Sequence, residues 1–143
     1  MKKNKSIYAM PNMGCLLGVA FQRQYSSLEA ELKSSGVGIT APEYLIMRVL
    51  INNSDLQPCE IADILGKDKA AISRCLTTLV EKGLVETNSV SHKCKRLQLT
   101  DKGNYLVPAI LKVAETKQRE LARVITQNEM NLLQELLIKI INN

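Results

Sequence analysis

The chain has 143 residues, of which 45% are hydrophobic and 23% are charged, as in one folded soluble domain. A net charge of +5 is consistent with a polyanionic partner, whereas 3% aromatic residues without tryptophan argue against a base-stacking or sugar-binding platform. No apolar run approaches the roughly 20 residues of a membrane span, and the N-terminus does not have the pattern of a secretory signal. We therefore expect a cytoplasmic protein without a membrane partner.

The first predicted element is a long amphipathic helix over residues 12–34, because apolar residues recur there at steps of three and four. Thr40-Ala41-Pro42-Glu43 then predicts the start of a second helix that runs to about Asn52. Thr40 would cap this helix, and Glu43 would complete a capping box.

Two short helices are predicted next, joined by a tight turn. The first spans residues 58–65 and ends at Gly66, and the second is capped by Asp68 and stops at Gly83. Ala62 is the small residue needed where the two helices cross. The predicted apolar contacts of this pair come from Ile61, Leu65, Ile72 and Cys75, and the apolar stripe of the second helix also includes Leu76, Leu79 and Val80.

From Leu84 the apolar period changes to two, which predicts a β-hairpin formed by "LVET" and "RLQLT". The polar stretch between them, residues 88–95, is predicted to be its tip. A further helix should begin at Thr100-Asp101 and be kinked by Pro108. A capping box at Thr126 to Glu129 opens the last helix.

The last helix carries a broad stripe of six large aliphatic residues, and the first helix is equally amphipathic. A monomer of this size cannot cover both, so we expect a homodimer. The predicted fold is mainly α with a small β-hairpin wing, a winged helix-turn-helix. Residues 40–103 would form a DNA-binding lobe, and residues 12–34 and 104–143 the dimerisation helices of a single domain.

The open side of the helix after Asp68 would enter the major groove of DNA. Arg74 is the predicted guanine reader, because its planar guanidinium matches the O6 and N7 atoms of that base. The other predicted contacts of the helix-turn-helix are Lys67, Lys69, Ala70, Ser73 and Thr77. The hairpin would follow the phosphates or the minor groove through His92, Lys93, Lys95 and Arg96. The alternative for each residue is a solvated surface.

"EIADILGKDKAAISRCLTTLVEKGLVE" followed by "LQLTDKG" resembles the MarR family of bacterial transcription regulators. The resemblance covers nearly the whole chain and implies an obligate dimer on a pseudo-palindromic operator. It also implies a repressor that a small phenolic ligand or an oxidant releases from DNA. One departure is in the wing, where the family usually carries Asp-x-Arg and this chain has Ser91-His92-Lys93.

A ligand pocket is predicted between the dimerisation helices and the DNA-binding lobe, with Tyr25, Tyr44, Met47 and Arg48 as candidate lining residues and apolar packing as the alternative. Cys15 occupies a place similar to that of a peroxide-sensing cysteine in the family; the alternative is a small core residue. No cofactor or metal is predicted. An enzyme is disfavoured, because the chain has no phosphate loop, nucleophile elbow or paired carboxylates. The alternative function is a winged-helix adaptor that docks proteins without specific DNA binding.

Overall fold

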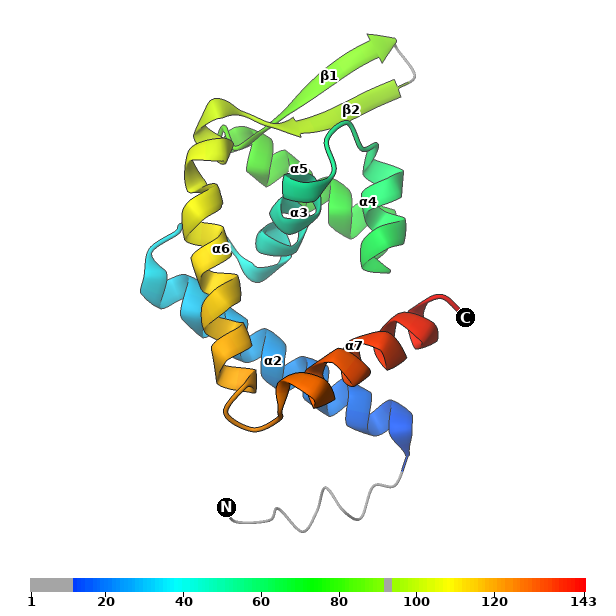
Figure 1. Cartoon of the computed structure of the whole chain (residues 1–143). Coiled ribbons are helices and arrows are strands. Elements are labelled where there is room, and N and C mark those ends of the chain that lie inside the picture. Colours follow the sequence, from blue (N-terminus) through cyan, green and yellow to red (C-terminus); the bar gives the residue numbers. More distant parts are fainter. Residues whose placement is uncertain (1–11, 92–93) are drawn as a thin grey trace.

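The structure, a computed structural model, describes residues 12–91 and 94–143 (Figure 1). Within these ranges the chain forms six helices and one antiparallel hairpin. In chain order the elements are α2 Met13–Ser35, α3 Ala41–Asn52, α4 Pro58–Leu65, α5 Lys69–Glu81, β1 Val85–Ser91, β2 Cys94–Leu99, α6 Asp101–Leu121 and α7 Gln127–Ile141. The predicted winged helix-turn-helix is therefore confirmed as the fold.

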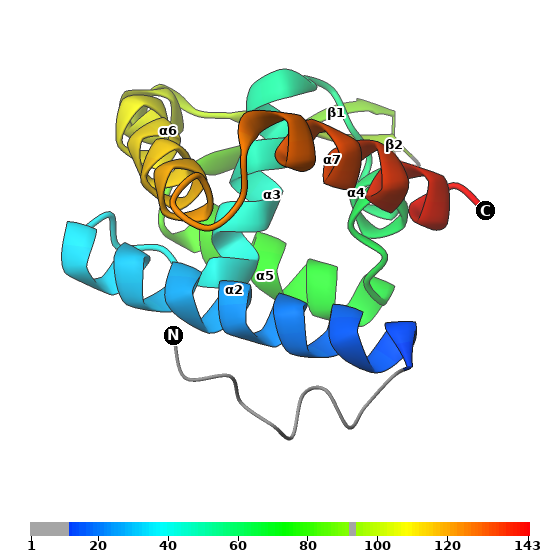
Figure 2. The same ribbon diagram turned by 60° about the horizontal axis from the view of Figure 1, so that its bottom comes forward.

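The helices α3, α4 and α5 pack together beneath the hairpin, and α6 runs from the hairpin to the opposite end of the molecule (Figure 1). At that end lie α2 and α7, and Figure 2 shows α2 extending across its width. Burial of apolar side chains between these helices is the main stabilising term of the lobe. The largest fully buried side chains are Ile46, Met47, Ile61, Ile72, Leu79, Leu97, Ile110 and Val85.

The predicted helix starts are confirmed by their caps. The side-chain oxygens of Thr40, Asp68, Thr100 and Thr126 each accept a hydrogen bond from a backbone N–H in the first turn of the helix that follows. Such bonds satisfy donors that the helix itself leaves unpaired. The capping box that opens α7 is complete, since Glu129 also accepts a bond from the N–H of Thr126 at 2.7 Å.

The capping box predicted at Thr40 is only half right. Thr40 accepts a bond from the N–H of Glu43 at 3.4 Å, but the Glu43 carboxylate does not reach back to Thr40. Instead it lies 2.7 Å from the Nζ atom of Lys82, at the far end of α5. The Glu43 carboxylate, which the local pattern predicts to complete the capping box, therefore pairs instead with Lys82, a residue remote in sequence.

The hairpin tip predicted over residues 88–95 is wrong in extent. Strand β1 continues to Ser91 and β2 begins at Cys94, with a register shift between Ser89 and Ser91. The polar residues at the ends of both strands gave no strand signal in the sequence. An exposed wing needs no apolar alternation, because backbone hydrogen bonds between its strands stabilise it. Residues 92–93 lie outside the described residues.

Two further expectations concern α5 and α6. Val80, expected in the buried stripe of α5, is exposed, because it lies beside rather than within the contact with α3 and α4. Helix α6 starts at Asp101 and continues through Pro108 as one element, so it crosses the boundary expected between residues 103 and 104. The kink at Pro108 and the division into lobe and dimerisation helices stay predictions.

Candidate nucleic-acid interface

The helix-turn-helix is formed by α4 and α5, which meet at a left-handed turn. Gly66 has φ +61°, a backbone conformation that glycine adopts without steric cost, and its N–H closes the end of α4. Ile61 and Ala62 on α4 and Ile72 on α5 are buried at the crossing, and Leu65 and Cys75 are half-buried. The predicted contacts of this pair are confirmed, and they leave the opposite side of α5 open.

That open side carries the residues predicted from the sequence. Lys69, Ala70, Ser73, Arg74 and Thr77 are all exposed on α5, and together they place one methyl group, two hydroxyls and two cations on one face. Small groups allow close approach of the helix to base edges, and cations favour phosphates or guanine. The surface has the chemistry that a major groove requires.

Two threonine hydroxyls of α5 are hydrogen-bonded to the backbone of their own helix. The Oγ1 atom of Thr77 donates to the carbonyl of Ser73 at 3.0 Å, and Thr78 bonds to Arg74 in the same way at 3.1 Å. A hydroxyl that has given its proton to the helix can still accept a bond, for example from an amino group of a base. For Arg74, the described residues provide no hydrogen bond or ion pair, so its five donors face solvent.

The predicted contacts near the wing do not form one group. Lys95 is exposed on β2. Lys67, at the turn before α5, is half-buried. His92 and Lys93 lie outside the described residues, so their predicted contacts stay predictions. The wing side chains that the structure describes thus supply one fully exposed cation, Lys95, and one that is bound, Arg96.

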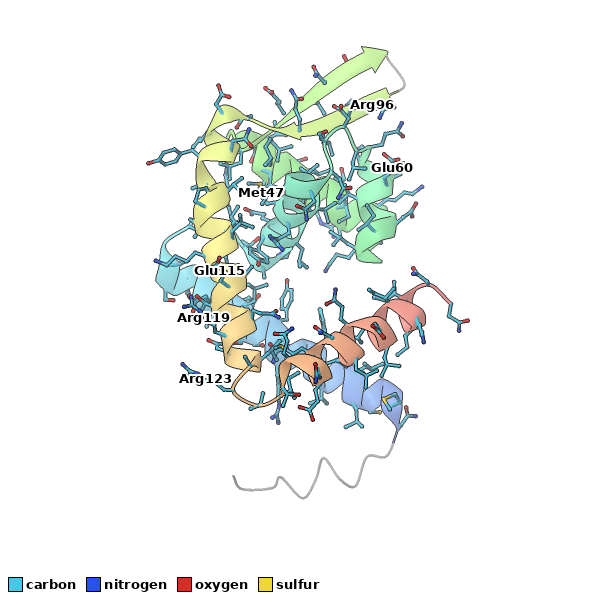
Figure 3. The ribbon with its side chains drawn as sticks, viewed as in Figure 1. Met47, Glu60, Arg96, Glu115, Arg119 and Arg123 are labelled. Atoms are coloured by element: carbon cyan, nitrogen blue, oxygen red, sulfur yellow. The ribbon has the colours of Figure 1, made fainter. Side chains whose placement is uncertain are left out.

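Arg96 has a structural contact that the sequence did not indicate. Its Nη1 atom donates to the backbone carbonyl of Asp55 at 2.8 Å, and Figure 3 shows Arg96 near the start of β2, on the side of the hairpin that faces α4. Asp55 has φ +64°, in the turn before α4, and the next residue, Leu56, pairs with Leu97 of β2. Arg96 thus fastens the wing to the helix-turn-helix, which leaves only its remaining donors for phosphate.

The predicted ligand-pocket residues are placed mainly by packing. Tyr44 and Met47 are buried in the core of the lobe, and Arg48 is half-buried (Figure 3). Tyr25 is half-buried on α2, with its ring centroid 5.4 Å from that of Phe21. Burial raises the pKa of Tyr25, and the nearby Glu29 carboxylate raises it further. Tyr44 and Met47 therefore fit the alternative of core packing, and a ligand pocket at these four residues stays a prediction.

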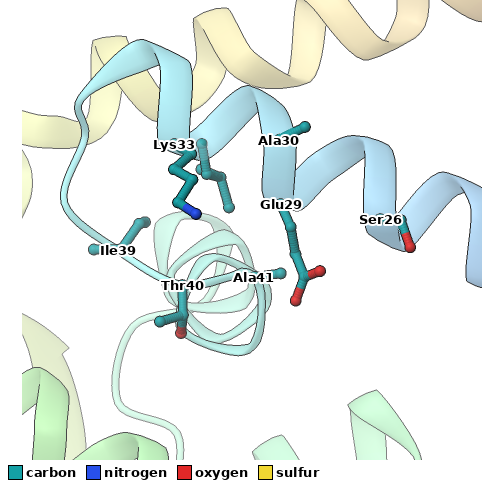
Figure 4. Close-up of a pocket in the computed structure, with 8 residues that line it drawn as sticks. Ser26, Glu29, Ala30, Lys33, Ile39, Thr40 and Ala41 are labelled. Carbon is teal, nitrogen blue, oxygen red and sulfur yellow. The ribbon is translucent and has the colours of Figure 1, made fainter.

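An open groove lies instead between α2 and the start of α3, with a volume of about 560 Å³ (Figure 4). Charged and hydroxyl side chains at its edge surround a floor of buried aliphatic residues. Its lining residues are Ser26, Glu29, Ala30, Leu32, Lys33, Ile39, Thr40 and Ala41. None of the four predicted residues lines it.

Residues 12–91 and 94–143 provide no group of side chains that could form a metal site. No three histidine, cysteine, aspartate or glutamate side chains in these ranges are arranged to hold a metal. Cys15 is exposed in the first turn of α2, so the expectation of a small core residue is wrong for the isolated chain, and its redox role stays a prediction. None of the described helices is long and apolar enough to cross a membrane.

Sequence reasoning missed an ion pair at the end of α5, between Glu43 and Lys82. Glu43 is the one buried charged side chain in the described part of the chain, and it pairs with Lys82 at the end of α5. The only sequence signal was "EKGL" before the strand, which indicates a turn but does not indicate that Glu43 pairs with Lys82.

The comparisons with known proteins agree with this geometry. The sequence profile of the MarR family matches residues 37–93. The transcriptional repressor MprA of Escherichia coli K12 is 25% identical over 113 residues, which are 78% of this chain and 64% of that repressor, less than two thirds of its length.

Two solved structures have the same fold over almost the whole chain. Wild-type MarR of E. coli in its apo form has a TM-score of 0.74 and 26% identity, with 92% of this chain and 98% of that chain covered. The transcriptional repressor CouR, solved bound to a 23-mer DNA duplex, has a TM-score of 0.81 and 22% identity, with 98% and 97% covered. The matching profile, the helix-turn-helix and these relatives together support the MarR family for this chain.

Proposed function

We propose that this chain is a sequence-specific transcription regulator that binds double-stranded DNA through α5 and the β1–β2 wing. The proposal rests on the open face of α5, where Arg74 is exposed and without an intramolecular partner beside the small residues Ala70 and Ser73. The similarity to the MarR family supports it, as does the similarity in fold to CouR, which was solved on a DNA duplex. The net charge of +5 favours association with a polyanion.

The finer proposal is a cytoplasmic homodimer that reads a pseudo-palindromic operator and acts as a repressor. The exposed aliphatic side chains of α7 favour a second copy as the cover of this helix. A twofold dimer would place two α5 helices about 34 Å apart, one turn of DNA. A small phenolic ligand or an oxidant would release the dimer from DNA, as the family resemblance implies.

The test is fluorescence anisotropy of the reduced protein on a labelled duplex from upstream of its own gene, with a scrambled duplex as control, over a salt series. We expect tighter binding to the upstream duplex and a steep fall of affinity with salt, because each phosphate contact releases counterions. Absence of binding to either duplex at low salt would contradict the proposal. It would instead favour the winged-helix adaptor, whose apolar contacts depend little on salt.

The role of Arg74 has its own test. Arg74→Ala should weaken binding to the preferred duplex by about 1–3 kcal/mol and relax the preference at one base pair of each half-site. Arg119→Ala is the matched control, because Arg119 is exposed on α6 toward its far end from the hairpin (Figure 3) and the same charge is removed. Equal losses on preferred and scrambled duplexes would rule out base reading by Arg74.

A further inference from the structure

Lys82 directly follows the last residue of α5 and caps this helix with a right-handed helical backbone conformation. The next residue, Gly83, has φ +71° and turns the chain toward β1. The orientation of both DNA-facing elements is therefore set at one short connector, residues 82–84. The Nζ atom of Lys82 lies 2.7 Å from Oε2 of Glu43 and 3.1 Å from the carbonyl of Gly38. The connector is thus held from the side of α3.

The backbone of the same connector is held from the side of α6. The carbonyl of Lys82 accepts a bond from Nζ of Lys102 at 2.8 Å, and that of Gly83 accepts one from Oγ1 of Thr100 at 2.5 Å. The N–H of Thr100 donates to the carbonyl of Leu84 at 3.1 Å. Since α6 also bonds to α2 through Lys117 and Ser27, at 2.6 Å, the connector links α5 and the wing to the helices at the other end of the molecule.

Glu43 is unusual because it is 3% exposed, while every other buried side chain in the described residues is apolar. Removing a carboxylate from water is costly, and its pairing with one ammonium group rarely gives a net gain in stability over apolar residues of the same size. The Lys82 side chain is 34% exposed, so water can satisfy its charge, but the buried Glu43 carboxylate is paired only where α5 places Lys82 beside it; the pair is therefore best explained by the geometry of α3 and α5 that it fixes.

The geometry matters at the DNA-facing end of α5. Because a helix rises about 1.5 Å per residue, Arg74 lies about 12 Å from Lys82 along the helix axis, and a tilt of about 5° at the connector moves Arg74 by about 1 Å. A displacement of that size is enough to spoil a bidentate bond to a base, whereas contacts with phosphates through flexible lysines tolerate it.

We propose that Glu43 is a positioning residue for DNA recognition: its pair with Lys82 fixes the angle of α5 and the wing, and it thereby sets discrimination between DNA sequences rather than overall affinity. This inference rests on the proposed function. Glu43 is buried and cannot itself touch DNA, so any effect of its substitution on sequence preference must act through Lys82 and α5.

The experiment uses the full chain and a duplex selected from a random library by the wild-type protein, with a scrambled duplex beside it. In Glu43→Gln, we expect the ratio of the two dissociation constants to fall by about tenfold, the size of one lost base contact, with binding to the scrambled duplex within about twofold of wild type. The double variant Glu43→Gln with Lys82→Met leaves no unpaired buried charge. It should show at least the same loss of the ratio, because it removes the contact between Glu43 and Lys82 and also the bond from Lys82 to the carbonyl of Gly38.

Two controls separate positioning from general loss of structure. Glu120→Gln removes an exposed ion pair, Glu120 with Lys117 at 2.8 Å, and should leave the ratio unchanged. Ile110→Val should lower the free energy of unfolding, because Ile110 is fully buried on α6. The ratio of the two dissociation constants should nevertheless stay unchanged while the protein is folded.

An unchanged ratio in both Glu43→Gln and the double variant, or an equal loss on the two duplexes, would overturn the proposal. If Glu43→Gln does not fold, the double variant alone decides between these outcomes. Failure of the wild-type protein to enrich any sequence is a different result, because it is seen before any variant is made and overturns the proposed function itself.

Discussion

The helix-turn-helix lobe and the terminal helices of this chain bury their apolar residues to very different degrees. In the lobe, Ile61 and Ile72 are at most 2% exposed, whereas α7 has no buried residue and Leu132 on it is 55% exposed. Both regions have equally clear amphipathic patterns in the sequence. The lobe thus buries its apolar residues within one chain, while α7 leaves an apolar face exposed, which is the face that the proposed dimer would cover.

The largest effect should come from a charge placed on the uncovered face. Leu136→Asp would bury two unpaired carboxylates in each proposed dimer, so we expect its dissociation constant to rise by at least about 100-fold, measured by sedimentation velocity. Ile64→Asp makes the same change at an exposed position on the lobe and should leave the oligomeric state unchanged. A Leu136→Asp protein that stays dimeric would show that α7 is covered by something else.

Within the lobe, two isoleucines of α4 provide the next contrast. Ile61→Ala should lower the free energy of unfolding by about 2–5 kcal/mol, because Ile61 is fully buried and the change leaves a cavity. Ile64→Ala, three residues later and 53% exposed, should change it by less than about 1 kcal/mol. Urea denaturation measures both, and equal losses would mean that the exposed face of α4 is covered in solution.

Two glycines extend the comparison to backbone contacts. In α6, a Cβ atom at Gly103 would collide with the carbonyl oxygen of Leu84, so Gly103→Ala should lower the free energy of unfolding by about 1–3 kcal/mol. In α2, a Cβ atom at Gly18 would meet no atom within 4 Å.

Gly18→Ala should therefore stabilise the fold by up to about 1 kcal/mol, because alanine is the better helix former. Thermal denaturation at two protein concentrations measures both glycine variants. A destabilised Gly18→Ala that also dissociates more readily would place position 18 against the second copy.

The smallest effect concerns the ionisation of a buried tyrosine. Burial raises the pKa of Tyr44 above the ordinary value of 10.0, although the nearby Arg48 partly opposes this. The unfolded chain therefore releases the proton first, and stability that is complete below pH 10 is lost as the pH rises toward the folded-state pKa. The urea midpoint should fall more steeply above pH 10 in wild type than in Tyr44→Phe, and identical slopes would contradict this.

Much of the fold could be predicted because its signals are local. Thr100 and Asp68 cap their helices as their residue types indicate, and Gly66 adopts the left-handed turn that ends α4. The same local reasoning placed Arg74 on the open side of α5, since the apolar period fixes the opposite side. Predictions of this kind need only residues within one or two helical turns.

The local patterns were incomplete where a distant partner competes with a local one. Glu43 had the spacing of a capping box, but Lys82 lies close enough to bind its carboxylate. Arg96 had the charge of a phosphate contact, but the carbonyl of Asp55 takes one of its donors. Neither partner is within thirty residues in sequence, so no local pattern could indicate it.

The sequence by itself determined the order, ends and buried faces of the helices, because caps, left-handed turns and apolar periods depend on neighbouring residues. The tertiary structure alone decided which charges are bound and which are open. Whether an arginine faces solvent or binds a carbonyl depends on the packing of elements remote in sequence, and so does the cover that α7 requires. In this chain those choices separate Arg74, whose guanidinium faces solvent, from Arg96, whose guanidinium fastens the wing to the lobe.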